Sequence, residues 1–113
     1  MAREDRPLRR CPGTDEAVEA FLAIGLRSEH SRRSYRIEWG RWRRFLRGRK
    51  VIPTEARRMD FEAYLAAVGE GKSRAVRTRA LAALRSIYAA LWQAGRVRWF
   101  AVGRVRLEKE EED

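Results

Sequence analysis

The stretch that decides the fold is residues 72–97, KSRAVRTRALAALRSIYAALWQAGRV. Ser73 is a good helix N-cap and Gly95 suits the position after the C-cap, with no Pro or inner Gly between them. Apolar side chains recur at spacings of three and four residues, which predicts one buried face of a helix. That face comprises Val76, Ala80, Leu84, Ile87 and Leu91.

The N-terminal half of this predicted helix is basic on its exposed side. At about 100° per residue, Arg74, Thr78 and Arg85 share the side opposite the apolar face, and Arg79 lies farther round it. The first turns contain no acid. A core helix whose exposed half has charge of one sign favours contact with a polyanion.

Residues 31–46 repeat this design, with Ser31 as the predicted N-cap. Apolar side chains occupy one arc of roughly 120° at the helical period. This arc comprises Tyr35, Trp39, Trp42, Phe45 and Leu46. The other side contains Arg32, Arg33, Arg36, Arg41, Arg43, Arg44 and Arg47. Only Ile37 and Glu38 fall on the wrong arc.

The composition fits one basic domain. A chain of 113 residues with 44% apolar side chains can form a single core. The formal charge of +10 is concentrated, since residues 27–50 hold ten basic and two acidic side chains and residues 72–85 hold five basic and none acidic. Residues 108–113 hold five acids and one Lys. This asymmetry favours a nucleic-acid surface or an anionic membrane. Arg outnumbers Lys by 23 to 3, which favours bidentate contacts to phosphate or guanine, although a GC-rich genome would produce the same bias.

Several function classes are disfavoured by the sequence. No apolar run approaches the ~18 residues of a membrane-spanning helix, and the N-terminus has no signal-peptide core. The single Cys11 cannot form an internal disulfide and indicates a reduced cytoplasmic setting. One His and one Cys are too few for a Cys/His zinc site, and residues 69–72 lack the spacing of a phosphate-binding loop. We therefore expect no metal and no cofactor.

The whole pattern predicts an all-α, compact four-helix domain. We expect a flexible arm over residues 1–13, the helical domain over 14–97 and a linker or tail over 98–113. A first helix is predicted from a Thr14 cap to about Ile24, and a third from about Glu55 to Val68 with Met59 among its buried residues. Residues 97–105 are compatible with an extended segment.

An ordered set of motifs now points to a family. Ser31-Arg-Arg-Ser34-Tyr35 precedes the aromatic arc, and Tyr64-Leu65 closes the third helix. The run from Arg79 to Tyr88, RALAALRSIY, lies in the fourth. In this order and spacing, residues 18–97 resemble the N-terminal core-binding, SAM-like domain of phage integrases and related tyrosine recombinases. The family usually continues with Asn-Pro, where this chain has Phe100-Ala101.

The resemblance implies a DNA-binding module of a tyrosine recombinase, active in DNA integration and recombination. The second and fourth helices would then lie crosswise at the major groove. The family's catalytic residues belong to a C-terminal domain, and too few residues follow Val97 to form one. We therefore expect no enzymatic activity and either an excised domain or a truncated relative. The expected partners are double-stranded DNA and other recombinase protomers on it, in the nucleoid of the cytoplasm, with no membrane and no small-molecule substrate.

Within this interpretation, the helix N-termini at Ser31 and Ser73 would bind phosphates, and arginines of the first turns would reach base edges. The candidate DNA-binding residues are Ser31, Arg32, Arg33, Arg36, Arg43, Lys72, Ser73, Arg74, Arg77, Thr78 and Arg79. No catalytic residue is predicted. His30-x-x-Arg33 matches a recombinase active-site motif, but no companion Lys, Arg and Tyr set surrounds it, and we reject that assignment.

Three other interpretations stay open at this point. The same basic helices would suit an RNA-binding protein, for example one associated with ribosomes. They would also suit a module that docks on an acidic protein partner or on a recombinase. A merely solvated surface would be expected to mix both signs of charge, unlike the faces predicted here.

Trp99-Phe100 would either cap the fold or pack on another domain.

Overall fold

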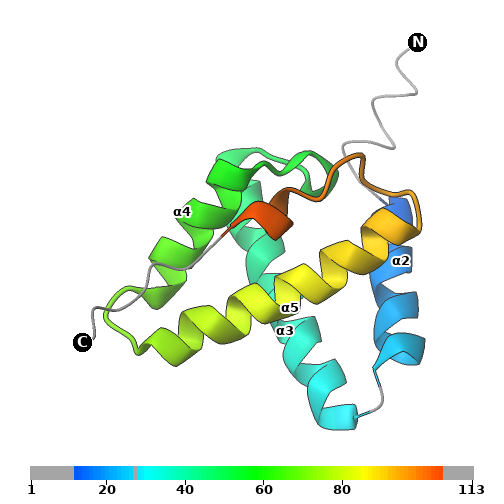
Figure 1. The fold of residues 1–113 in the computed structure, drawn as a ribbon, viewed down its shortest axis with the longest axis horizontal. Helices are drawn as coiled ribbons and strands as arrows, with labels where there is room; N and C mark the ends of the chain where they lie inside the picture. The colour runs from blue at the N-terminus through cyan, green and yellow to red at the C-terminus, as the bar shows by residue number, and fades with distance from the viewer. Residues whose placement is uncertain (1–11, 27, 106–113) are drawn as a thin grey trace.

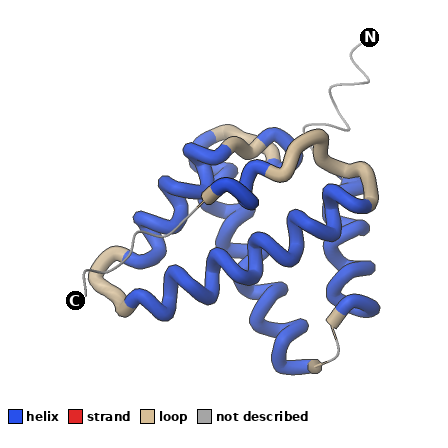
Figure 2. Tube along the Cα trace, viewed as in Figure 1, coloured by secondary structure: helices blue, strands red, loops and turns tan. Residues whose placement is uncertain are grey.

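The computed structural model describes residues 12–26 and 28–105, and these residues form four α-helices joined by turns (Figures 1 and 2). The helices are α2 (Pro12–Ala20), α3 (Glu29–Arg49), α4 (Arg58–Gly69) and α5 (Arg74–Gln93). A π-helical turn, η2 (Phe21–Gly25), continues α2, and the 3₁₀ turns η3 (Pro53–Glu55) and η4 (Ala101–Arg104) follow α3 and α5. The described residues include no strand, so the all-α prediction is confirmed. Within the same ranges, no helix is long and apolar enough to cross a membrane.

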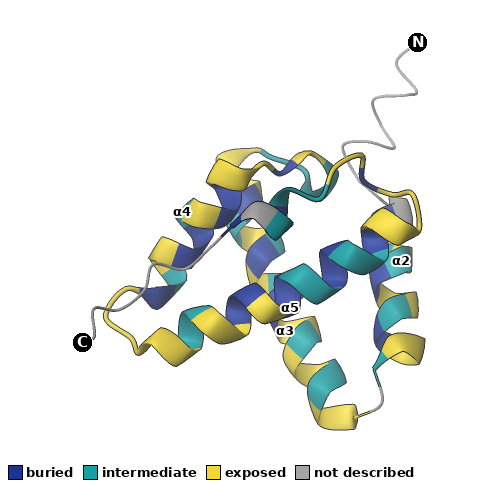
Figure 3. Ribbon diagram, in the orientation of Figure 1, coloured by how far each residue is buried: buried dark blue, intermediate teal, exposed yellow. Residues whose placement is uncertain are grey.

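The central helix is α5, which packs against α2, α3, α4 and η4. In Figure 3, buried residues recur along the middle of α5, and exposed residues lie at its two ends. Of the apolar face predicted from the sequence, Ala80, Leu84, Ile87 and Leu91 are buried, and Val76 is partly buried. The helix begins after Ser73 and ends at Gln93, where Gly95 adopts the left-handed conformation that stops it (φ 75°). These features agree with the sequence-based boundaries.

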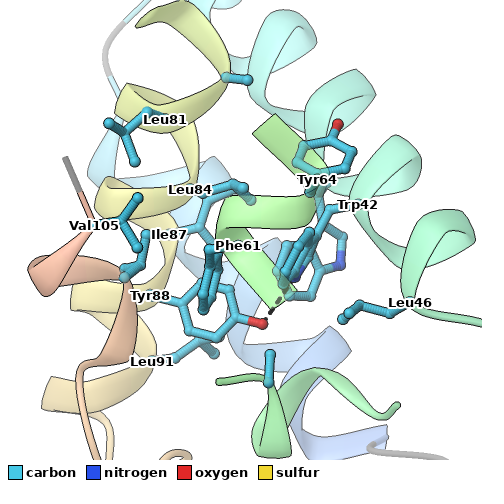
Figure 4. Packing of buried hydrophobic residues seen from close by; sticks show 14 of the residues in the cluster. Trp42, Leu46, Phe61, Tyr64, Leu81, Leu84, Ile87, Tyr88, Leu91 and Val105 are labelled. Carbon is cyan, nitrogen blue, oxygen red and sulfur yellow. Dashed lines mark hydrogen bonds between the residues drawn. The ribbon is translucent and has the colours of Figure 1, made fainter. Parts of the chain in front are cut away.

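An aromatic cluster joins α3, α4 and α5 (Figure 4). Trp42 is fully buried and stacks on Phe61, with ring centroids 4.4 Å apart. Its indole Nε1 donates to Tyr88 Oη at 2.9 Å, and Tyr88 Oη donates to the Pro53 carbonyl at 2.8 Å. The edge of Tyr64 meets the Trp42 ring at 5.2 Å. Since the indole and phenol groups of this cluster are hydrogen-bonded, the bonds offset the cost of burying them where the three helices meet.

The predicted helix starts were wrong at three places. The first helix begins at Pro12, so Thr14 is a buried helical residue rather than a cap. The second is capped by Ser28, whose Oγ accepts from the Ser31 backbone N–H at 3.2 Å. The third begins at Arg58, because Asp60 accepts from the Arg57 N–H at 2.8 Å and so fixes the N-cap there. At the second and third helices, a neighbouring polar side chain provides the competing cap.

Two further expectations need correction. Met59 is 63% exposed, since at about 100° per residue it lies on the side of α4 opposite Phe61. Residues 97–105 are not extended throughout, because η4 occupies part of them. Val102 and Val105 are buried in the common core although the sequence places them in a linker or tail. The packed unit therefore continues past Val97 to Val105.

Candidate nucleic-acid interface

The helices α3 and α5 cross each other (Figure 1). A groove lies between them, lined by side chains of both. It is a hollow of about 360 Å³ formed by the N-terminal halves of both helices. We call it the α3–α5 groove. Its lining residues are Ser34, Tyr35, Ile37, Glu38, Arg41, Arg79, Ala82 and Ala83.

The groove has a small-residue wall on α5 and a mixed wall on α3. Ala82 and Ala83 have no side-chain atoms beyond Cβ, so a ligand can approach the α5 backbone closely there. On the α3 wall, Ile37 is an apolar residue that is 49% exposed. A hollow lined by an exposed apolar side chain, two hydroxyl-bearing residues and two guanidinium groups offers both apolar and polar contacts. Those are the contacts that base edges in a DNA groove require.

Glu38 explains why one acid lies on the apolar arc of α3. Its carboxylate is buried and accepts a hydrogen bond from Tyr64 Oη. Arg41 Nη1 lies 3.8 Å from the same carboxylate, at the edge of the groove. Burial, followed by the hydrogen bond and charge of Glu38, raises the pKa of the Tyr64 phenol above its ordinary value. Because Glu38 is thus paired on two sides, it leaves the groove with a cationic edge.

Two cations stand at the groove, one from each helix. Arg79 is exposed, and no acid among the described residues forms an ion pair with it. Arg41 is about half exposed and retains free guanidinium donors beside Glu38. Arg33 and Arg44 are exposed on the same outer side of α3 as Ile37, at about 100° per residue. A polyanion in the groove would meet all of these charges.

The opposite flank of α3 faces α2, and its arginines are already paired. Arg36 binds Glu19 at 3.0 Å, and Arg43 lies 3.4 Å from Asp15. The hydrogen bond and charge of Glu19 raise the pKa of Arg36 above its ordinary value. Arg32 donates to the Leu26 carbonyl at 2.6 Å and also pairs with Glu29 at 3.3 Å. Three candidate residues of the sequence analysis, Arg32, Arg36 and Arg43, therefore point away from the groove.

The candidate residues on α5 divide into two groups. Lys72, Ser73, Arg74, Thr78 and Arg79 are exposed. The Ser73 hydroxyl makes no capping hydrogen bond, whereas the Ser31 N–H is bonded to Ser28. Arg77 instead packs across Gly69 at the end of α4, where a Cβ on Gly69 would collide with its side chain. The start of α5, rather than that of α3, thus presents the freer polar groups.

Of the groove-lining residues, only Arg79 is a predicted candidate, and the residues missed on α3 include Ser34, Ile37 and Arg41. They share one face of α3 with Glu38, at spacings of three and four residues. The signal was present, because Ile37 and Glu38 were the two residues that broke the amphipathic pattern. An apolar residue displaced toward solvent beside a charged residue displaced inward marks the boundary of the buried face.

The family model described as "Phage integrase, N-terminal SAM-like domain" matches residues 19–95. These residues include both walls of the α3–α5 groove. No curated protein and no solved structure matches the chain.

Proposed function

Because the chain belongs to the phage integrase N-terminal SAM-like domain family, we propose that it binds double-stranded DNA as the recognition module of a tyrosine recombinase. The α3–α5 groove faces the duplex in this proposal. The domain of this family is the non-catalytic part of an integrase. We therefore assign no step of strand cleavage or joining to the residues of this domain.

The observation that carries the proposal is the division of charge on α3. Its α2-facing arginines are paired with acids, whereas Arg33 and Arg44, on the outer side, have no ion-pair partner among the described residues. The facing helix α5 contains no acid at all. Free positive charge is therefore concentrated on the side where the two helices form a hollow. Such a surface fits phosphates spaced along a duplex.

The polar groups of the groove fit two kinds of DNA contact. Exposed Lys72, Ser73 and Arg74 surround the N-terminus of α5, where unpaired backbone N–H groups favour phosphate. Arg79 and Arg41 lie further inside and have the forked donors that recognise guanine. Ile37 offers an apolar surface to a thymine methyl group. We assign the first group to the DNA backbone and the second to base edges.

The proposal is tested by titrating a fluorescent duplex with the protein at several salt concentrations. We expect binding that weakens steeply with salt, because phosphate contacts release counterions. Arg41→Gln combined with Arg79→Gln should weaken binding about tenfold or more if both contact DNA. The matched control is Arg36→Gln with Arg43→Gln, which removes the same charge from the α2 flank and should weaken binding much less.

Three outcomes would contradict this function. Equal losses in the two double variants would show that net charge alone, and not the groove, governs binding. Tighter binding to a structured RNA than to the duplex would favour an RNA-binding protein instead. Retention of the complex in high salt would indicate a protein partner rather than nucleic acid.

A further inference from the structure

The segment that follows α5 returns to the side of α4 (Figure 1). Trp99 belongs to this segment and contacts Ala56, just before α4. Trp99 is 41% exposed although five aromatic residues of the same domain, Trp39, Trp42, Phe61, Tyr64 and Tyr88, are buried. The indole Nε1 donates to the Ala56 carbonyl at 3.4 Å, and the Arg57 guanidinium lies 6.0 Å above the ring. The ring is thereby held in place while one part of it remains open.

Two hollows meet at this ring. One, of about 760 Å³, is lined by Arg57, Arg58, Trp99, Phe100, Ala101 and Gly103. The other, of about 340 Å³, is lined by Thr54, Glu55, Arg57, Arg96, Val97, Arg98 and Trp99. Arg57 and Trp99 form the wall that both share. We call the two hollows together the Trp99 surface; it shares no residue with the α3–α5 groove.

The charged side chains of the Trp99 surface are mostly basic. Arg57, Arg58, Arg96 and Arg98 are all exposed around the ring. Glu55 is the one acid among the lining residues. Arg58 is paired with Glu62 at 2.9 Å, whereas Arg96 and Arg98 have no ion-pair partner among the described residues. The ligand of such a surface must carry negative charge on more than one side of the ring.

The aromatic surface continues beyond Trp99. Phe100 lines the larger hollow and stacks on the half-exposed Trp92, with ring centroids 5.6 Å apart and planes 4° apart. A Cβ on Gly103 would lie 2.7 Å from the Phe100 ring, so only glycine leaves room for the ring in this position. A fixed aromatic face bordered by cations is the arrangement that binds single-stranded nucleic acid, with bases stacked on rings and phosphates on arginines.

We propose that the Trp99 surface binds single-stranded nucleic acid by stacking an unpaired base on Trp99, with Arg96, Arg98, Arg57 and Arg58 contacting the adjacent phosphates. A duplex is not the ligand here, since its paired bases expose no face to a protruding ring. This second site goes beyond duplex recognition at the α3–α5 groove. It would let the domain hold an unpaired stretch beside a bound duplex.

The test uses the full chain with Trp92→Phe, which keeps a ring against Phe100 and leaves Trp99 as the exposed tryptophan, because Trp39 and Trp42 are buried. The probe is an oligothymidylate of about eight nucleotides, within the length that one small binding domain covers. Stacking on Trp99 should quench its fluorescence. Arg96→Gln with Arg98→Gln should raise the half-saturating concentration roughly tenfold, because two phosphate contacts are lost.

Substitutions at Trp99 separate stacking from folding. Trp99→Leu should abolish binding of the oligonucleotide measured by anisotropy, and Trp99→Phe, which keeps an aromatic face, should retain most of it. Arg79→Gln is the control at the groove and should leave oligothymidylate binding unchanged while it weakens duplex binding. The absence of quenching at low salt would overturn the proposal. So would an equal effect of Arg79→Gln and the Arg96/Arg98 variant, because the single strand would then bind in the groove.

Discussion

Glu38 shows how a single carboxylate can be accommodated on the apolar side of a basic helix. It is buried between Tyr64, which donates a hydrogen bond, and Arg41, which lies at the solvent edge. Hydrophobic periodicity alone cannot predict this pair, because Tyr64 comes from another helix 26 positions away. What the sequence does reveal is the anomaly itself, an acid within an apolar arc.

We predict that Tyr64 makes the protein less stable in alkali. Its native pKa is raised by burial, whereas an unfolded tyrosine titrates near pH 10. Above about pH 10 the unfolded chain releases this proton and the native protein keeps it, so the unfolding free energy falls by about 1.4 kcal/mol per pH unit. Urea midpoints measured on either side of pH 10 test this. Tyr64→Phe should have a shallower alkaline slope, and identical slopes would contradict the assignment.

Gly69 and Arg77 form a second residue-scale pair, which predicts a coupling. Gly69→Ala places a Cβ against the Arg77 side chain and should destabilise the native state. With Arg77→Ala in place, the same substitution should be neutral or stabilise by about 0.5–1 kcal/mol, because Ala favours helix over Gly. A double-mutant cycle by thermal or urea unfolding measures the difference. If the stability changes of the two single variants add up in the double variant, Arg77 moves away from the new Cβ without a loss of stability, and the predicted coupling is absent.

At the scale of elements, the four helices could be predicted and their ends could not. Long apolar stripes of helical period identify α3 and α5, and packing inside the structure follows those stripes. The starts depend on which of several polar residues caps the first turn, as with Ser28 and Ser31. The sequence also could not predict that the arginines on one flank of α3 form ion pairs and those on the other flank do not. Glu19 and Asp15 reach Arg36 and Arg43 from another helix, so no local spacing reveals them.

Two substitutions on neighbouring helices test which stripes are buried. Leu84→Ala on α5 removes a side chain with no exposed surface and should cost roughly 2–5 kcal/mol of stability. Met59→Ala on α4 should change stability by about 0.5 kcal/mol or less, because its side chain is mostly in solvent. Unfolding curves of both variants provide the comparison. A large loss of stability in Met59→Ala would indicate that Met59 is buried, as the sequence predicted.

At the scale of the whole molecule, the segment after α5 belongs to the fold. Val102 and Val105 are buried in the common core, and Arg85 donates to the Val105 carbonyl. Nothing in residues 98–105 has a clear period, which is why their packing could not be anticipated from the sequence. Their attachment also places Trp99 against the start of α4.

Truncation therefore has a predicted boundary. Ending the chain after Val97 should lower the unfolding free energy by roughly 3 kcal/mol, because two buried valines and their contacts are lost. Ending it after Val105 keeps both buried valines and is the matched control. Thermal unfolding of the two shortened chains and the parent distinguishes these outcomes. Equal stability of all three would place the end of the core at Val97.

The pairing of α2 acids with one flank of α3 has a kinetic consequence. A protein with its excess charge spread evenly would collide with DNA in many orientations and would have to reorient after most collisions. Here Glu19 and Asp15 neutralise the flank beside α2, so the charge across α3 is asymmetric, a local dipole whose positive end is the groove side. In the field of a duplex, the proposed ligand, this local dipole would turn the groove toward the DNA before contact. Removing those two acids should therefore strengthen attraction yet reduce the fraction of encounters that are productive.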